Sequence, residues 1–250
     1  MAVPQIQKAV LVIADIGGYT RFMKLTRMNL AHAQQVVADL LVAVIDAAEP
    51  LQLAKLEGDA ALLWAPMSAD VRQRQELADA VMRIRSAFLG KRTQMSTDNS
   101  CSCESCEQIS NLKLKFVAHT GDVALQKVKR YVELAGVDVI LVHRMLKNDV
   151  PVNEYMLVTD ELAGELPESV KALAQKLEHD FEGIGEVTTH FVDLTKLPMP
   201  PPPPPRQGVL RRLWRTVSVN AAALPEILGL SKPLAGYERT KESIKPVSSE

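Results

Sequence analysis

The stretch that most constrains the fold is VLVIADIGGYT, residues 10–20, in which a continuous apolar run ends at an aspartate and two glycines. A run without polar alternation is typical of a strand buried on both faces, so residues 8–16 predict a central strand of a sheet. Asp15 then lies at the end of that strand. A carboxylate in this place either caps the following helix or binds a ligand at the edge of the sheet.

Strand and helix patterns alternate along residues 8–194, which predicts an α+β or α/β domain. Helices are expected over residues 30–48, 69–89, 137–146 and 160–166, hairpins over residues 51–64 and 179–194, and single strands over residues 112–119 and 155–159. Gly90 predicts the end of the second helix, and Thr120-Gly121-Asp122 predicts a turn after the strand that precedes it.

The globular pattern ends at a proline run, residues 198–205, in which Met199 is the only other residue. Such a run predicts an extended polyproline spacer. We therefore expect a folded domain over residues 1–196, a linker over residues 197–206 and a tail over residues 207–250. Four arginines interleave with apolar residues around the start of this tail, so it either lies on an anionic membrane surface or packs on the domain or a dimer partner.

Charge and hydropathy exclude several classes of protein. A formal net charge of -1 over 250 residues provides no basic field for nucleic acid. No apolar run reaches the roughly 18 residues that span a bilayer, and the N-terminus lacks the charged-then-apolar layout of a signal peptide. The sequence predicts a cytoplasmic protein without a nucleic-acid partner, in which the tail is the part suited to peripheral membrane contact.

A second notable carboxylate lies in LAKLEGDAALLW, residues 53–64, where Asp59 follows Gly58 at the tip of the expected hairpin. Two carboxylates at strand ends, Asp15 and Asp59, can converge on Mg²⁺ or Mn²⁺, because hard cations prefer carboxylate oxygens and substrate phosphates. From spacing alone the plainer interpretation is favoured, in which Asp59 shapes its turn and Asp15 caps a helix.

All three cysteines, Cys101, Cys103 and Cys106, fall in a polar insert over residues 91–110. An odd number so tightly grouped argues against a disulfide framework. The spacing instead favours one Zn²⁺ ion. The fourth ligand would be His119, His143, Glu104, Glu107 or a cysteine of a partner chain. The alternative is an exposed loop whose thiols bind nothing or form a reversible redox pair.

Four motifs in order, ADIGGYTRFM, KLEGDAALLW, FVAHTGDV and VDVILVHRML, resemble the landmarks of the class III nucleotidyl cyclase homology domain. That family has an aspartate on its first strand followed by a Gly/Ser-aromatic-Thr step. It continues with a Lys-x-x-Gly-Asp hairpin, a His-x-Gly turn and a helix that ends in an arginine. The resemblance covers residues 8–194. It implies an α+β fold, a ferredoxin-like α/β sandwich of the nucleotidyl cyclase type, which works as a head-to-tail homodimer with shared active sites.

The resemblance also implies roles for individual residues. The two metal-binding aspartates of the family fall on Asp15 and Asp59, and the backbone carbonyl of Ile16 is the usual extra metal contact. The arginine that stabilises the transition state falls on Arg144. Two Mg²⁺ or Mn²⁺ ions and a purine nucleoside triphosphate are the ligands so implied.

Base recognition and the departures from the family concern four more positions. The purine-selecting lysine falls on Lys55, and the second purine-contacting position falls on Glu133. The catalytic asparagine of the family falls on Ile140, which has no donor to orient a ribose or phosphate. His143, on the same helix, either partly replaces that donor or is an ordinary half-buried histidine.

Three functions follow from these residues. The first is a cyclase that converts a purine nucleoside triphosphate into a 3′,5′-cyclic nucleotide. The second is a catalytically degenerate domain that binds nucleotide or metal and signals through dimerisation or its tail. The third is a scaffold whose cysteine site carries the function. A divergent cyclase-like subfamily of unknown function, with a similar cysteine-rich insert and a segment like LKNDVPVNEY, is the nearest resemblance.

Overall fold

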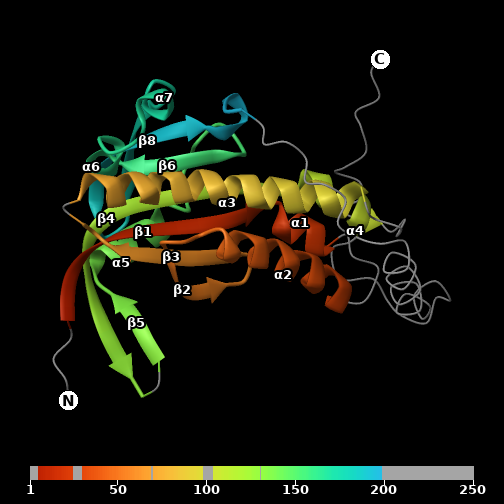
Figure 1. The fold of residues 1–250 in the computed structure, drawn as a ribbon, viewed down its shortest axis with the longest axis horizontal. Coiled ribbons are helices and arrows are strands. Elements are labelled where there is room, and N and C mark those ends of the chain that lie inside the picture. Colours follow the sequence, from red (N-terminus) through yellow and green to blue (C-terminus); the bar gives the residue numbers. More distant parts are fainter. Residues whose placement is uncertain (1–4, 25–29, 69, 98–103, 130, 199–250) are drawn as a thin grey trace. The chain divides into compact units, whose positions relative to one another are not determined.

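The computed structural model of the chain describes residues 5–24, 30–68, 70–97, 104–129 and 131–198 (Figure 1). The expected tail, nearly all of the proline run, and Cys101 and Cys103 lie outside the described residues. The predicted division into domain, linker and tail therefore stays a prediction.

An eight-stranded sheet forms the centre of the fold. Its strands are β1 (Gln5–Gly17), β2 (Gln52–Glu57), β3 (Ala60–Pro66), β4 (Lys113–Val128), β5 (Tyr131–Ala135), β6 (Tyr155–Thr159), β7 (Gln175–Phe181) and β8 (Gly185–Asp193). Their order is β2-β3-β1-β4-β6-β8-β7, with β5 paired only to β4. β1 and β3 are antiparallel, whereas β4 and β6 are parallel. The buried strand expected at residues 8–16 is confirmed as an inner strand of this sheet.

Helices and short helical turns connect the strands. They are α1 (Tyr19–Lys24), α2 (Leu30–Asp46), α3 (Val71–Thr97), α4 (Glu104–Glu107), α5 (Val137–Arg144), α6 (Asp160–Ala163) and α7 (Glu168–Lys171), with 3₁₀ turns at Ile109–Asn111 and Leu194–Lys196. No helix among the described residues is long and apolar enough to cross a membrane. The α+β prediction is confirmed.

The alternation of side chains along β1 separates two layers of core. Leu11 and Ile13 pack in one cluster with Val142 of α5. Val10 and Val12 point to the other face, where the first part of α3 runs along the sheet (Figure 1). The sheet is therefore covered by α5 on one face and by α3 on the other.

The described residues divide into two compact units. The first comprises those of residues 1–17, 43–88 and 114–199, and it contains the sheet, the first part of α3, and α5 to α7. The second comprises those of residues 18–42 and 89–113, which include α1, most of α2 and α4. Every residue of the carboxylate site described below belongs to the first unit.

The predicted end of a helix at Gly90 is wrong, because α3 continues to Thr97. A glycine inside a helix costs only about 1 kcal/mol relative to alanine. The neighbouring turns bury Leu89 and Met95, which are 5% and 2% exposed. This burial outweighs the weak helix propensity of one glycine.

The predicted turn at Thr120-Gly121-Asp122 is also wrong, because β4 runs through it to Val128 and then pairs with β5. The Thr120 hydroxyl donates to the carbonyl of Ala9 on β1. A Cβ at Gly121 would lie 2.2 Å from Cγ of Asp138. The glycine therefore permits a close approach of α5 to the strand rather than a turn.

Candidate carboxylate site

The ends of β1 and of the β2–β3 hairpin bring two aspartates into one neighbourhood. Asp15 is the register partner of Ala60, the residue next to Asp59. The Ile16 N–H donates to the carbonyl of Asp59 over 3.1 Å. Because this bond joins the strand end to the hairpin tip, the backbone fixes the carboxylates of Asp15 and Asp59 at the same edge.

A lysine that the sequence analysis did not consider completes the cluster. Nζ of Lys115, on β4, lies 2.8 Å from Oδ2 of Asp15, and the two side chains are 24% and 14% exposed. Burial lowers the pKa of Lys115, but the hydrogen bond and the charge of Asp15 outweigh it and raise that pKa. Lys115 is therefore a cation held against Asp15.

Asp59 is the group in this cluster whose charge is least balanced. Burial and then the negative charge of Asp15 raise the pKa of Asp59 to about 6, against a smaller opposing effect of Lys115. One ammonium thus faces two carboxylates. When both aspartates are ionised, the cluster carries excess negative charge, which is the electrostatic condition that favours a divalent cation.

The donor set fits an open cation site rather than a closed one. Among the described residues no group of three or more His, Cys, Asp or Glu side chains could hold a metal by themselves. Mg²⁺ is usually bound by one or two carboxylates together with water and substrate phosphates. Asp15, Asp59 and the Ile16 carbonyl are the groups that would hold it.

Lys55, expected to read a purine, lies on β2 beside α5. Its Nζ is 3.6 Å from Oε1 of Glu57, and Oε2 of Glu57 is 3.0 Å from Nε2 of His143. Nδ1 of His143 lies 2.7 Å from the carbonyl of Val139. The partner of each ring nitrogen is therefore a hydrogen-bond acceptor, a backbone carbonyl oxygen at Nδ1 and a carboxylate oxygen at Nε2. Both nitrogens are therefore engaged, and His143 has no free donor to replace the missing asparagine.

Arg144 and Ile140 lie on the exposed side of α5. Ile140 is 52% exposed, and Nη1 of Arg144 donates to Oε2 of Glu182 over 3.0 Å. The two residues line a shallow depression with Val139, His143 and Lys147. Glu133 lies elsewhere, exposed on β5, in register with Gln126 of β4.

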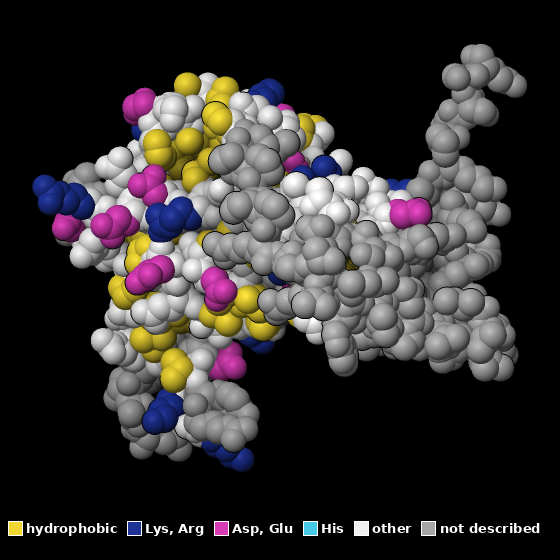
Figure 2. All heavy atoms as spheres, turned by 45° about the vertical axis from the view of Figure 1, so that its right-hand side comes forward, with side chains coloured by type: hydrophobic (Ala, Val, Ile, Leu, Met, Phe, Trp, Pro, Cys, Tyr) yellow, Lys and Arg dark blue, Asp and Glu magenta, His cyan; other side chains and the backbone are white. Residues whose placement is uncertain are grey.

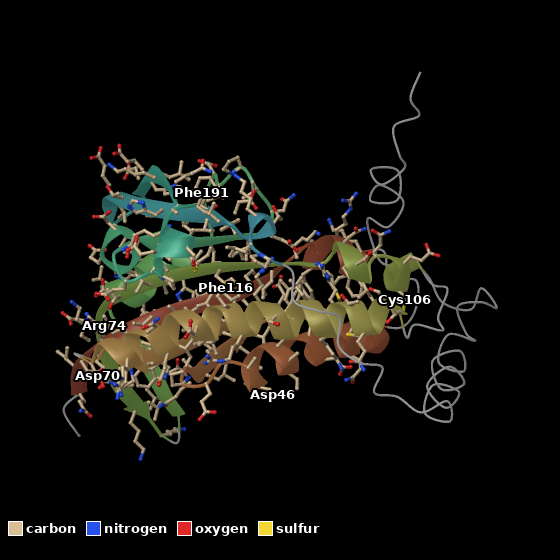
Figure 3. All side chains as sticks on the ribbon, turned by 45° about the horizontal axis from the view of Figure 1, so that its top comes forward. Asp46, Asp70, Arg74, Cys106, Phe116 and Phe191 are labelled. Carbon is tan, nitrogen blue, oxygen red and sulfur yellow. The ribbon has the colours of Figure 1, made fainter. Side chains whose placement is uncertain are left out.

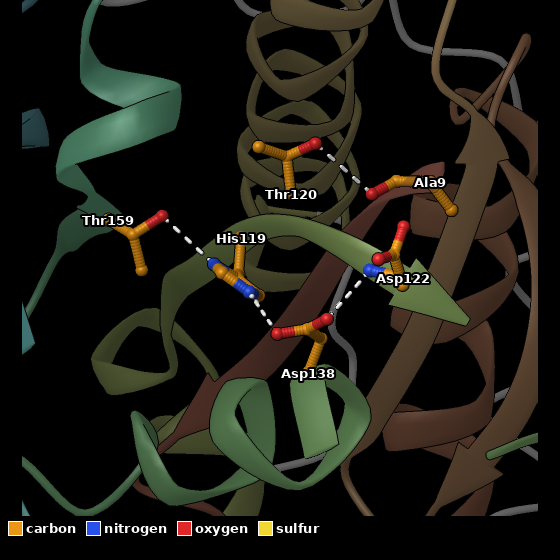
Figure 4. Close-up of polar contacts among 6 residues, drawn as sticks. All are labelled: Ala9, His119, Thr120, Asp122, Asp138 and Thr159. Atoms are coloured by element: carbon orange, nitrogen blue, oxygen red, sulfur yellow. Dashed lines mark hydrogen bonds and ion pairs between the residues drawn. The ribbon is translucent and has the colours of Figure 1, made fainter. Parts of the chain in front are cut away.

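A buried polar network fixes α5 to the sheet (Figure 4). Nε2 of His119 donates to Oδ1 of Asp138 over 3.0 Å, and Nδ1 lies 3.0 Å from the Thr159 hydroxyl. Oδ2 of Asp138 accepts from the Asp122 N–H over 2.6 Å. Because Asp138 belongs to the first turn of α5, these bonds set where Ile140 and Arg144 point.

The predicted zinc site is only partly within the described residues. Cys106 lies in α4 and is 4% exposed (Figure 3). Cys101 and Cys103 lie outside the described residues. His119 and His143, named as fourth ligands, are hydrogen-bonded to Asp138 and Glu57. The zinc site stays a prediction.

Two sequence comparisons match this chain. Residues 37–155 match a family model described as a protein of unknown function, DUF2652. Over 201 residues the chain is 53% identical to the uncharacterized protein Rv2561/Rv2562 of Mycobacterium tuberculosis (strain ATCC 25618 / H37Rv). That match covers 80% of this chain and 93% of the mycobacterial protein.

Solved structures of cyclases share the fold. The adenylyl cyclase CyaB from P. aeruginosa matches with a TM-score of 0.59 and 13% identity, over 77% of this chain and 96% of that one. The guanylate cyclase domain of RhGC from Catenaria anguillulae, in complex with GTP, matches with a TM-score of 0.53 and 16% identity, over 76% and 98%. The cyclase-type fold implied by the four motifs is confirmed.

Proposed function

The chain belongs to the family of the mycobacterial protein Rv2561/Rv2562 and has the fold of adenylyl and guanylyl cyclase domains, and we propose that it is a divergent class III nucleotidyl cyclase-like protein. Its ligands are a purine nucleoside triphosphate and divalent Mg²⁺ or Mn²⁺. The reaction is formation of a 3′,5′-cyclic nucleotide with release of pyrophosphate.

The observation that supports this proposal most directly is the cluster of Asp15, Asp59 and Lys115. Two half-buried carboxylates share a single ammonium, which is bonded to Asp15, and an unbalanced charge of this kind is typical of a ligand site. Asp15 and Asp59 would hold a divalent cation there, and that cation would neutralise charge on the phosphates and activate the ribose hydroxyl. The Ile16–Asp59 backbone bond keeps the two carboxylates in place for that role.

The remaining roles come from the resemblance. Lys55 and Glu133 contact the purine, and Arg144 stabilises charge that develops on the phosphate. In a head-to-tail dimer these groups serve a site shared between two chains. The charge-assisted bond between Arg144 and Glu182 is exposed, so it exchanges readily for a phosphate.

The dimer has a suitable surface. Six large apolar side chains on β2, the β4–β5 hairpin and α5 are between 41% and 65% exposed. They are Leu53, Leu56, Val128, Val132, Val137 and Ile140. Figure 1 shows β5 and the end of β4 projecting from the sheet, and Figure 2 shows hydrophobic side chains on and beside this hairpin. Exposed apolar groups in this number favour a protein partner, here a second copy.

A second function, binding without turnover, is favoured by α5. Ile140 stands where the family has its catalytic asparagine, and His143 has both nitrogens engaged. The same carboxylate edge would then bind nucleotide and metal, and signal through dimerisation or the tail. We keep two further proposals beside it: a Zn²⁺ ion at Cys101, Cys103 and Cys106, and a cytoplasmic protein whose tail contacts the membrane surface.

Cyclic nucleotide formation from ATP and GTP with Mn²⁺, run beside the Asp15→Ala variant, tests the proposal. Product from the wild-type protein that is lost in the variant supports a cyclase. Absence of product together with thermal protection by nucleotide, again lost in the variant, supports the binding module. If neither product nor thermal protection is observed, both functions are contradicted. The cysteine site would then be the remaining candidate for the function.

A further inference from the structure

A cavity of about 50 Å³ lies on the α3 face of the sheet. It is lined by α3, by strands β1, β4 and β6, and by the segment that contains α6 and α7. Every lining side chain is apolar except Arg74 and Glu165. A cavity with such walls stays dry and accepts apolar molecules in preference to water.

The cavity is separate from the carboxylate site. Val10 and Val12 line it, and they alternate along β1 with Leu11 and Ile13, which pack toward α5. Asp15 follows Leu11 and Ile13 at the same two-residue spacing along β1. Its side chain therefore points to the α5 face of the sheet, away from the cavity. No residue assigned above to nucleotide, metal or catalysis lines the cavity.

The walls of the cavity can adapt to a ligand. Three of the nine methionines line it, namely Met67, Met82 and Met156. An unbranched thioether side chain changes rotamer at low energy and packs well against varied shapes. One wall is the segment from Leu162 to Val170, where α6 and α7 are only four residues each. The cavity can therefore enlarge without disturbing the sheet.

The two polar side chains that line the cavity, Arg74 and Glu165, form an ion pair with each other. Nη1 of Arg74, near the start of α3 (Figure 3), donates to Oε1 of Glu165 over 3.0 Å and so joins α3 to the α6–α7 segment. Nε of Arg74 is buried and has no hydrogen-bond partner within the part of the chain that the structure describes. A buried unpaired donor is unfavourable, and an acceptor oxygen beside it would remove the penalty.

The same ion pair indicates the charge of that acceptor. Glu165 already balances the charge of Arg74. A ligand carboxylate would approach Glu165 and be repelled, whereas a hydroxyl or carbonyl oxygen accepts from Nε without repulsion. We propose that this cavity binds a small, uncharged, largely hydrocarbon molecule with one hydroxyl or carbonyl oxygen that accepts from Nε of Arg74.

The volume limits the size of this ligand. A dry cavity of about 150 Å³ holds benzene. The cavity here is about a third of that, so an alcohol of about four carbons fits once the methionines change rotamer and enlarge the cavity. Larger rings would require the α6–α7 segment to move.

The test is a titration of the full chain with n-butanol, followed by NMR of ¹³C-labelled methionine methyl groups. We expect saturable shifts confined to the resonances of Met67, Met82 and Met156. Butyrate, in which a charged carboxylate replaces the CH₂OH group, should bind more weakly. Ala78→Leu fills the cavity and abolishes the shifts, whereas Ala87→Leu, a half-buried residue of the same helix that does not line the cavity, retains them.

A second variant isolates the role of the oxygen. Arg74→Lys keeps the charge but removes Nε, so it weakens butanol binding about fivefold, the loss of one hydrogen bond, and leaves xenon binding unchanged. The proposal is overturned by non-saturable shifts, by shifts that persist in Ala78→Leu, or by butyrate binding as tightly as butanol. None of these outcomes affects the nucleotide proposal, since no residue is shared.

Discussion

Two polar clusters on β4, four residues apart and on the same face of the strand, differ in how well their groups are satisfied. At His119 each ring nitrogen has a partner, and both oxygens of Asp138 accept a hydrogen bond. At Lys115 one ammonium faces two carboxylates, and burial and then the negative charge of Asp15 raise the pKa of Asp59 to about 6. A fully paired network rigidifies a fold, whereas an unbalanced one is typical of a ligand site. The difference favours a structural role for His119, and it supports the proposed ligand site beside Lys115.

The largest effect is expected at Gly121. Gly121→Ala places a Cβ against the Asp138 carboxylate and breaks the bonds that hold α5, so we expect unfolding to become easier by about 3 kcal/mol. Urea unfolding measures it. Gly164→Ala, whose Cβ meets only a carbonyl at 3.9 Å, is the control and should be nearly neutral. Equal stabilities of the two variants would contradict a structural role for the Asp138 network.

The next effect is expected at Lys115. Lys115→Met leaves two carboxylates without their cation, which destabilises the metal-free protein by about 2 kcal/mol, between the values for exposed and buried pairs. The same change should strengthen Mn²⁺ binding about tenfold, because the cation no longer competes with an ammonium. Calorimetric titration with Mn²⁺ gives the affinity. Lys176→Met, which removes an exposed ion pair, is the control and should change neither the stability nor the Mn²⁺ affinity. Weaker Mn²⁺ binding by Lys115→Met would contradict a cation site at Asp15 and Asp59.

A smaller effect concerns pH. Because the folded state raises the pKa of Asp59 from 3.8 to about 6, the folded protein binds this proton more tightly than the unfolded chain. The stability contributed by the protonated group is complete below about pH 4 and is lost as pH rises through about 6. Cation binding needs the ionised group, so the rise in Tm with Mn²⁺ should grow between about pH 5 and pH 7. Asp59→Asn should remove this pH dependence. A rise in Tm with Mn²⁺ that does not depend on pH in the wild-type protein would contradict the role of Asp59 in binding the cation.

The smallest effect on stability is expected at Ile140. Ile140 is exposed, so Ile140→Asn should change the free energy of unfolding by no more than about 0.5 kcal/mol. The variant restores a donor at the position of the family's asparagine, so cyclic nucleotide formation with Mn²⁺ should rise above the wild-type level. Val137→Asn, an exposed residue of the same helix, serves as the matched control. Equal amounts of product from both variants would show that the absence of an asparagine at position 140 does not limit turnover.

Elements with strong periodicity were predictable from the sequence. The β6 strand, the α5 helix and the hairpins around Gly58 and Gly183 follow from apolar spacing and turn residues, and the structure confirms them. The continuation of β4 was not predictable, since Thr-Gly-Asp has the composition of a turn. The strand continues because it pairs with β5, which the sequence did not predict, and the Asp122 N–H bonds to Asp138, 16 residues further along the chain.

The candidate site was predictable only in part. Asp15 and Asp59 were identified through their glycines and the resemblance to cyclases, and their metal role stays a prediction. Lys115 was missed because a lysine in an alternating strand is expected to face solvent, and its partner lies 100 positions earlier in the sequence. The signal that could have found it is the apolar run after it, FVA, which predicts a strand too buried to leave a lysine unpaired.

The central claim, that the edge formed by Asp15 and Asp59 binds a divalent cation with a nucleotide, is tested most directly by electron paramagnetic resonance of Mn²⁺ titrated with the protein and ATP at about pH 7.5. The signal of free Mn²⁺ should fall with saturation beyond the loss that ATP causes alone, for the wild-type chain and not for Asp15→Asn. Equal Mn²⁺ binding by the two proteins would contradict the claim.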